Sequence, residues 1–184
     1  MELVLFALWF FAPAGVANSS PVFANKIPFL KNLGMPIDRG RTYKGKRILG
    51  DNKTYRGFIA GVLSGFATAL LQMNLYTSFD WFTTVSPDID YSQPVVLLLG
   101  VAIGFGALFG DAVESFFKRQ LSFSSGKSWF PFDQLDYILG GLLFSIPFVT
   151  LTAMQYIAII IVWFLIHPVA TFIGWNLKLK DKPI

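Results

Sequence analysis

Acidic side chains in the second half of the chain have the spacing of a site that handles phosphates and a metal ion. Asp111 is followed by Glu114 and Lys118, and residues three, four and seven apart share one face of a helix. Asp133 and Asp136 are three apart and would also share a face. Magnesium takes one or two carboxylates together with phosphate oxygens of a substrate. The pattern therefore indicates a place where Mg²⁺ and a phosphorylated substrate could meet.

Each half of this pattern also has a purely structural interpretation. Lys118 could simply form an ion pair with Asp111 or Glu114 at the end of a helix. For any one carboxylate, this explanation is about as good as a functional site. Asp133 and Asp136 stand near the start of a predicted helix, where the helix dipole favours negative charge. However, two carboxylates on one face, close to a third on a neighbouring helix, exceed what capping needs.

The decapeptide ILGDNKTYRG, residues 48–57, is the most polar part of a basic segment that runs directly into an apolar stretch. Lys and Arg at the membrane surface can also reflect the general excess of cations in cytoplasmic loops, or they can bind anionic lipid headgroups. Yet acidic and basic side chains at one surface fit a nucleotide–metal site better, because the metal neutralises phosphates while Lys and Arg hold the remaining charge.

The composition is that of an all-α integral membrane protein. Of the 184 residues, 54% are hydrophobic and 14% are charged, whereas a soluble domain carries about a quarter charged residues. A membrane-spanning helix needs about 20 apolar residues. The charge-free stretches therefore predict five transmembrane helices in one membrane domain covering residues 1–184. The predicted spans are residues 3–25, 57–78, 93–117, 134–151 and 156–177, with loops at 26–56 and 118–133. The last two spans share one long stretch without Asp, Glu, Lys or Arg, and its polar residues Thr150, Thr152 and Gln155 predict the turn between them.

The distribution of cations predicts the orientation. All 15 Lys and Arg residues fall within 26–56, 118–127 and 178–182, which five spans place on one side. Cytoplasmic loops carry the excess of Lys and Arg. We therefore expect a multi-pass protein of the cell membrane with its N-terminus outside and its C-terminus in the cytoplasm. The long, ordered loop between the first two helices and the active site would be cytoplasmic.

Glycines recur at helix-packing spacing in several predicted spans. Gly100 and Gly104 form one GxxxG pair, and Gly106 and Gly110 form another. Small residues at this spacing let helices approach closely in a membrane. We expect close packing within the chain; the pattern permits a dimer without requiring one.

Two motifs together resemble a known enzyme family. Ser115–Arg119, with Asp111 before it and Asp133 and Asp136 after it, is similar to the signature of CTP-dependent phosphatidate cytidylyltransferases, the CDP-diacylglycerol synthases. The shorter spacing from Lys118 to Asp133 and the absence of His-Gly-Gly depart from that signature. GKRILGDNKTYRGF, residues 45–58, and FDQLDYILGG, residues 132–141, instead resemble the archaeal branch, the CDP-archaeol synthases.

This resemblance implies a nucleotidyltransferase that moves CMP from CTP to 2,3-di-O-geranylgeranyl-sn-glycero-1-phosphate, giving a CDP-archaeol and pyrophosphate. The implied cofactor is Mg²⁺, and the implied partners are CTP and an isoprenoid glycerol-phosphate lipid, with no nucleic acid. Residues matching the catalytic signature are Asp111, Lys118, Arg119, Asp133 and Asp136, of which the three aspartates match metal ligands. Residues matching the nucleotide-side loop are Gly50, Asp51, Asn52, Lys53, Thr54 and Arg56.

Other functions remain open at the level of sequence. A CDP-diacylglycerol synthase would do the same chemistry on phosphatidate, and a CTP-dependent lipid-alcohol kinase would release CDP instead of pyrophosphate. An ion-coupled transporter could use Asp111, Glu114 and His167 as a relay, but all except His167 lie toward one membrane face. A scaffold protein would leave the carboxylates unexplained.

Overall fold

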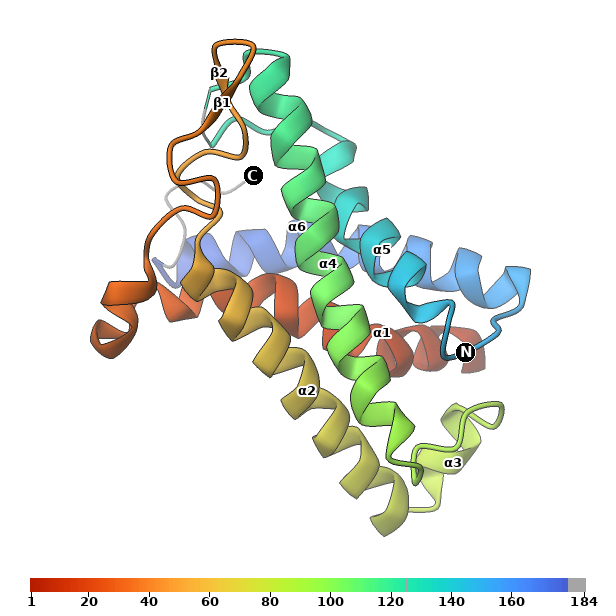
Figure 1. Ribbon diagram of the computed structural model, residues 1–184. Helices are drawn as coiled ribbons and strands as arrows, with labels where there is room; N and C mark the ends of the chain where they lie inside the picture. Colours follow the sequence, from red (N-terminus) through yellow and green to blue (C-terminus); the bar gives the residue numbers. More distant parts are fainter. Residues whose placement is uncertain (125, 179–184) are drawn as a thin grey trace.

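The computed structural model describes residues 1–124 and 126–178. These residues form a helical bundle with one short hairpin (Figure 1). The elements in chain order are α1 (Glu2–Ala24), the 3₁₀ helix η1 (Pro28–Leu33), β1 (Thr42–Tyr43), β2 (Lys46–Arg47), α2 (Tyr55–Ser78), α3 (Trp81–Val85), α4 (Val95–Gln120), α5 (Phe132–Ser145) and α6 (Ala153–Asn176).

Among the described residues, four helices, α1, α2, α4 and α6, are long and apolar enough to cross a membrane. They coincide closely with four of the five predicted spans. The predicted orientation stays a prediction, and Lys180 and Lys182, which contribute to it, lie outside the described residues.

Helix α5 is shorter than the span predicted over residues 134–151. Its 14 residues reach about 21 Å, whereas a bilayer core is about 30 Å thick. The helix ends at Ser145, and although Ile146 still has helical backbone angles, Pro147 has no N–H with which to continue the helical hydrogen bonds. A fifth crossing therefore remains a prediction, in which α5 would need the residues that follow it to complete the passage.

The start of α6 confirms the turn that polar residues predicted between the last two helices. The Gln155 N–H donates to the Thr152 hydroxyl at 3.2 Å, and the Thr152 N–H donates to the Gln155 side-chain oxygen at 2.8 Å. This reciprocal pair is a capping box, which satisfies two otherwise unpaired donors.

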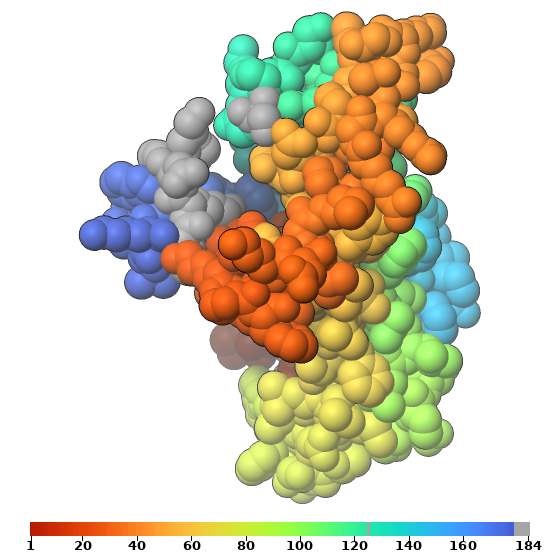
Figure 2. Space-filling view, turned by 60° about the vertical axis from the view of Figure 1, so that its left-hand side comes forward, coloured from red at the N-terminus to blue at the C-terminus, as the bar shows by residue number. Residues whose placement is uncertain are grey.

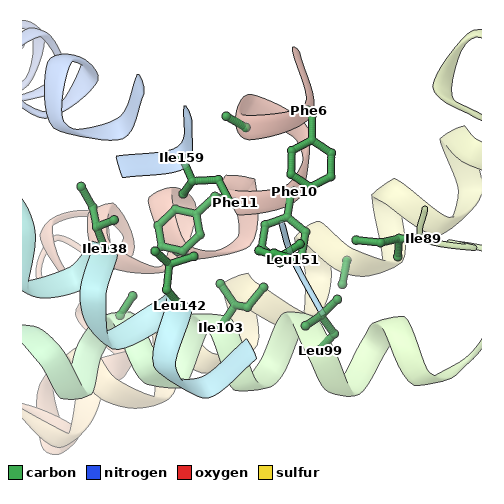
Figure 3. Packing of buried hydrophobic residues seen from close by; sticks show 14 of the residues in the cluster. Phe6, Phe10, Phe11, Ile89, Leu99, Ile103, Ile138, Leu142, Leu151 and Ile159 are labelled. Atoms are coloured by element: carbon green, nitrogen blue, oxygen red, sulfur yellow. The ribbon is translucent and has the colours of Figure 1, made fainter. Parts of the chain in front are cut away.

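The buried apolar core joins α1, α4, α5 and α6. Phe10 and Phe11 from α1, Ile103 from α4, Ile138 from α5 and Ile159 from α6 are all fully buried. Figure 3 shows their side chains gathered in one cluster. Because α1 and α4 both contribute to this cluster, the core fixes α4 against three other helices.

Glycines allow α4 to approach α2 and α5 backbone to backbone, as the GxxxG spacing predicted. A Cβ at Gly65 of α2 would lie 2.6 Å from the Gly100 carbonyl oxygen of α4. On the other side of α4, a Cβ at Gly110 would overlap the carbonyl oxygen of Asp136 in α5. The second approach places Asp111, the next residue of α4, beside the turn of α5 that carries Asp136.

Candidate active site

The end of α4 presents Asp111, Glu114 and Lys118 toward one cavity. The Lys118 ammonium lies 2.9 Å from Glu114 Oε1 and also donates to Asp133 Oδ1 of α5. The second oxygen of Asp133 accepts from the Trp129 N–H at 2.7 Å. The Glu114–Lys118 pair that the structural interpretation proposed therefore exists, as one part of a larger cluster.

Three carboxylates from α4 and α5 come together within reach of a single cation. One oxygen from each of Asp111, Glu114 and Asp136 lies within 4.8 Å of the others. Glu114 is buried, with 7% of its surface exposed. Carboxylate oxygens are the donors that Mg²⁺ prefers, so the donor set fits a hard divalent cation.

The predicted and observed acidic groups overlap without being identical. Asp111 and Asp136 belong to both sets. Asp133 lines the same cavity, but its oxygens contact Lys118 and the Trp129 N–H, so its role as a ligand stays a prediction. Sequence reasoning placed Glu114 on the correct face but assigned it no metal role. Its spacing of three from Asp111 was the available signal.

The loop between α1 and α2 supplies the opposite wall. Lys53 reaches across to Asp111, with 2.5 Å between its Nζ and Asp111 Oδ2. Lys53 and Asp111 are 58 residues apart in the sequence. The fold therefore brings the motif of residues 45–58 next to the motif that begins at Asp111. The ion pair places a cation directly beside the three-carboxylate group.

Two other residues of the predicted nucleotide loop have structural contacts. The Thr54 hydroxyl caps α2 by accepting from the Gly57 N–H at 3.1 Å. The Arg56 guanidinium donates to the Asn25 side-chain oxygen at 2.5 Å, which ties the start of α2 to the end of α1. Both contacts fix the loop where it enters α2.

Asp51 is held on the outer side of this loop. Its carboxylate lies 2.8 Å from Arg47 Nη1, and its side chain is 77% exposed. Asp51 lines the rim of the cavity, so it braces Arg47 while remaining accessible to a ligand.

Asp38 is a buried carboxylate that sequence reasoning missed. Its side chain is 1% exposed and forms an ion pair of 2.8 Å with Arg47. Burial alone would raise its pKa, but the hydrogen bonds from Arg47 and from the backbone N–H groups of Gly50, Leu49 and Gly40 outweigh it and hold the pKa of Asp38 far below its usual range. Asp38 is therefore ionised near neutral pH.

One cavity of about 760 Å³ gathers most of the predicted site. Figure 2 shows residues 26–56, in orange, extending from the middle of the molecule to its upper end, where Lys46 and Arg47 are hydrogen-bonded to Gln120 at the end of α4. Predicted site residues that line the cavity are Asp51, Asn52, Lys53, Thr54, Asp111, Lys118, Arg119, Asp133 and Asp136. Gly50 and Arg56 do not line it, although Gly50 lies against the Arg119 side chain.

The cavity also has residues to which the sequence assigned no role. Lys127 lines it from the segment between α4 and α5, and His167 lines it from α6, beside the ring of Tyr137. Cations from three segments therefore line the cavity with the carboxylates: Lys53 from the loop, Lys118 from α4 and Lys127 from the segment between α4 and α5.

Comparison with known proteins identifies a family that matches the whole chain. A model of the CarS-like family, described as CDP-archaeol synthase, matches residues 1–184. A CDP-archaeol synthase of Thermococcus onnurineus is 38% identical over 184 residues, covering 100% of this chain and 98% of the relative. One of Methanospirillum hungatei is 37% identical over 166 residues, covering 86% and 95%.

A solved structure shows the same fold. It is described as an intramembrane enzyme for archaeal membrane lipids biosynthesis, and it superposes with a TM-score of 0.70 at 31% identity, covering 89% of this chain and 91% of that one. Both motifs of the cavity lie within the region matched by the family, and the chain belongs to the CDP-archaeol synthase family.

Proposed function

We propose that the cavity between the 26–56 loop, α4 and α5 is where CTP reacts with an isoprenoid glycerol phosphate to give a CDP-archaeol and pyrophosphate. The observation that carries the proposal is the ion pair between Lys53 and Asp111. It places the cationic side of the cavity directly beside the three-carboxylate group. Family membership supports a nucleotidyltransferase, and the span-length apolar helices support a membrane-embedded lipid partner.

The reaction itself requires little covalent help from the protein. A phosphomonoester has a second pKa of about 6, so the lipid phosphate is already largely a dianion near neutral pH. One of its oxygens attacks the α-phosphorus of CTP. A new P–O bond forms while the bond to the bridging oxygen breaks, and that oxygen leaves with the pyrophosphate. Catalysis then consists of positioning and charge neutralisation.

The residues divide into a metal side and a cationic side. Asp111, Glu114 and Asp136 would hold Mg²⁺, with Asp133 adjacent through Lys118. Bound Mg²⁺ would supply charge neutralisation on the phosphates and the leaving group. Lys53, Lys118 and Arg119 offset further negative charge, and Asn52 contributes a neutral hydrogen-bonding group. The concentration of cations in 26–56 supports a cytoplasmic position for this site, where soluble CTP can reach it.

The position of an isotopic label tests the reaction. Purified protein in lipid or detergent is given Mg²⁺, a geranylgeranyl glycerol phosphate and CTP labelled at either the α- or the γ-phosphorus. We expect the α-label in a lipid product and the γ-label in pyrophosphate. A parallel reaction supplies the lipid alcohol in place of its phosphate, and transfer of the γ-label to that alcohol would instead identify a kinase. The same CMP transfer to phosphatidate at equal rate would identify a diacyl-lipid enzyme.

Removing the Lys53 charge is expected to weaken CTP binding. Lys53→Met keeps the length of the side chain but loses a charge-assisted hydrogen bond worth about 1.5–3 kcal/mol, which is roughly 10- to 100-fold in affinity. The dissociation constant for CTP with Mg²⁺, measured by calorimetry, checks this. Lys31→Met is the matched control, because Lys31 lies exposed on η1 in the same loop. Equal affinities in both variants would contradict a phosphate-binding role for Lys53.

A further inference from the structure

We infer that Asp38 is a positioning residue for the reaction, because its buried carboxylate fixes the segment 49–53 that carries Lys53 to the cavity wall. The inference rests on the proposed function of that wall. Asp38 lies outside the residues that line the cavity, so it would act on substrate only through other groups.

Four groups donate to this one carboxylate. Oδ1 accepts from the Gly40 N–H at 3.0 Å and from Arg47 Nη2 at 2.8 Å. Oδ2 accepts from the N–H groups of Leu49 at 2.9 Å and Gly50 at 3.0 Å, and from Arg47 Nε at 3.3 Å. A carboxylate with both oxygens saturated in this way compensates for its own burial.

The contacts bind two distant stretches of the loop into one unit. The residues just before Asp38 run beside those that carry Lys53: the Ile37 N–H donates to the Lys53 carbonyl at 2.8 Å, and Pro36 forms a bridge with Thr54. Gly50 adopts a φ of +92°, a conformation that glycine adopts readily. The Asp38 carboxylate accepts a hydrogen bond from the Gly50 N–H at this turn. It therefore holds the turn through which the chain continues to Lys53.

The Asp38–Arg47 pair also connects the loop to the end of α4 that carries Lys118 and Arg119. Arg47, held by Asp38, accepts at its carbonyl from Gln120 Nε2 at 3.2 Å. Its neighbour Lys46 donates to the Gln120 carbonyl at 2.5 Å. Asp38 thus stands between the helix end that follows Lys118 and Arg119 and the loop segment that carries Lys53.

Asn is the appropriate substitution because it keeps the size and removes the charge. An amide has one acceptor oxygen and two N–H donors, so its nitrogen would face backbone N–H or guanidinium donors where Asp38 has an oxygen. At least one buried donor then loses its partner. We expect segment 49–53 to loosen while the helical bundle keeps its fold, because the hydrogen bonds of Asp38 described above all lie within the loop.

The experiment measures CTP binding and loop order separately from turnover. Asp38→Asn should raise the dissociation constant and the KM for CTP at least tenfold, with a change of less than threefold in kcat at saturating CTP. Limited trypsin digestion should become several times faster at Arg39, Arg41, Lys44 and Lys46. Asp90→Asn is the control, because Asp90 is also a hydrogen-bonded carboxylate but lies in the segment between α3 and α4.

A double variant separates positioning from general stabilisation. If Asp38 acts through Lys53, Asp38→Asn should weaken CTP binding by less than threefold once Lys53 is already Met, because neighbouring effects on one interaction are not additive. Independent, multiplying effects would overturn the inference, as would normal CTP affinity in Asp38→Asn. Should Asp38→Asn not fold, Arg47→Lys, which keeps the charge but loses the two-pronged contact, must show the same pattern.

The two levels of the proposal can fail separately. If Lys53→Met leaves CTP binding unchanged, the assignment of the nucleotide wall is wrong. If Lys53→Met weakens binding and Asp38→Asn does not, the wall stands and the positioning role of Asp38 is wrong.

Discussion

Replacing Asp136 with Asn is expected to lower the rate of CMP transfer about a thousandfold or more. Asp136 contributes the α5 oxygen of the three-carboxylate group, together with Asp111 and Glu114 of α4. Losing metal-mediated charge stabilisation costs several kcal/mol in the transition state, and 1.4 kcal/mol is a factor of ten in rate. The initial rate of pyrophosphate release, measured with saturating CTP and lipid phosphate, checks this expectation.

Metal binding provides the second readout and the control. Mn²⁺ titrated into the protein with CTP present should bind at least tenfold more weakly to Asp136→Asn, whereas Asp90→Asn should match the wild type. Asp133→Asn separates the two possible metal sets. Weakened Mn²⁺ binding would make Asp133 a ligand, as the family signature implies, and unchanged binding with reduced rate would assign it to holding Lys118. Normal activity in Asp136→Asn would exclude the proposed metal side.

Much of the architecture could be predicted because apolar length and polar spacing are local properties of a sequence. The charge-free stretches located α1, α2, α4 and α6, and the polar cluster at Thr152 and Gln155 located the turn before α6. The spacing of Asp111, Glu114 and Lys118 predicted that they share one face of α4, and all three line the same cavity. The same reasoning extended α5 too far, because apolar residues continue beyond Ser145, whereas Pro147 has no N–H with which to continue the helix.

The parts that could not be predicted depend on contacts between distant backbone groups. Asp38 has no side-chain motif to reveal it, since three of its donors are main-chain N–H groups. Only the folded loop brings them to one carboxylate. Glu114 differs: its spacing was visible in the sequence, but its place in the three-carboxylate group depends on how closely α5 approaches α4.

That approach links the helix-packing glycines to the proposed active site. Gly110 directly precedes Asp111, and Gly140 lies one helical turn after Asp136. The two backbones are so close that a Cβ at Gly140 would overlap the Gly106 carbonyl oxygen. A GxxxG spacing that the sequence assigned to packing alone therefore also affects the distance between the carboxylates on α4 and α5 that we propose as metal ligands.

Gly110→Ala should consequently reduce activity at least about a hundredfold, although alanine is ordinarily the better helix former. The new methyl group would overlap the Asp136 carbonyl oxygen and lie 3.2 Å from the Gly140 Cα, both of which are backbone atoms with little freedom to move. Separating the helices moves Asp111 away from Asp136, and a misplacement of about 1 Å can cost about 10²-fold in rate. Overpacking should also lower stability by about 1–3 kcal/mol. Pyrophosphate release and the thermal unfolding midpoint measure the two effects.

Val113→Ile is the matched control, because it adds one carbon to an exposed side chain of the same helix. It should leave both rate and midpoint close to wild type. The decisive comparison is Mn²⁺ binding at a temperature where Gly110→Ala is still folded. If the variant binds metal normally, the glycine contact serves stability alone. If metal binding falls together with the rate, the distance between α4 and α5 is itself a catalytic parameter, which Gly110 sets without touching substrate.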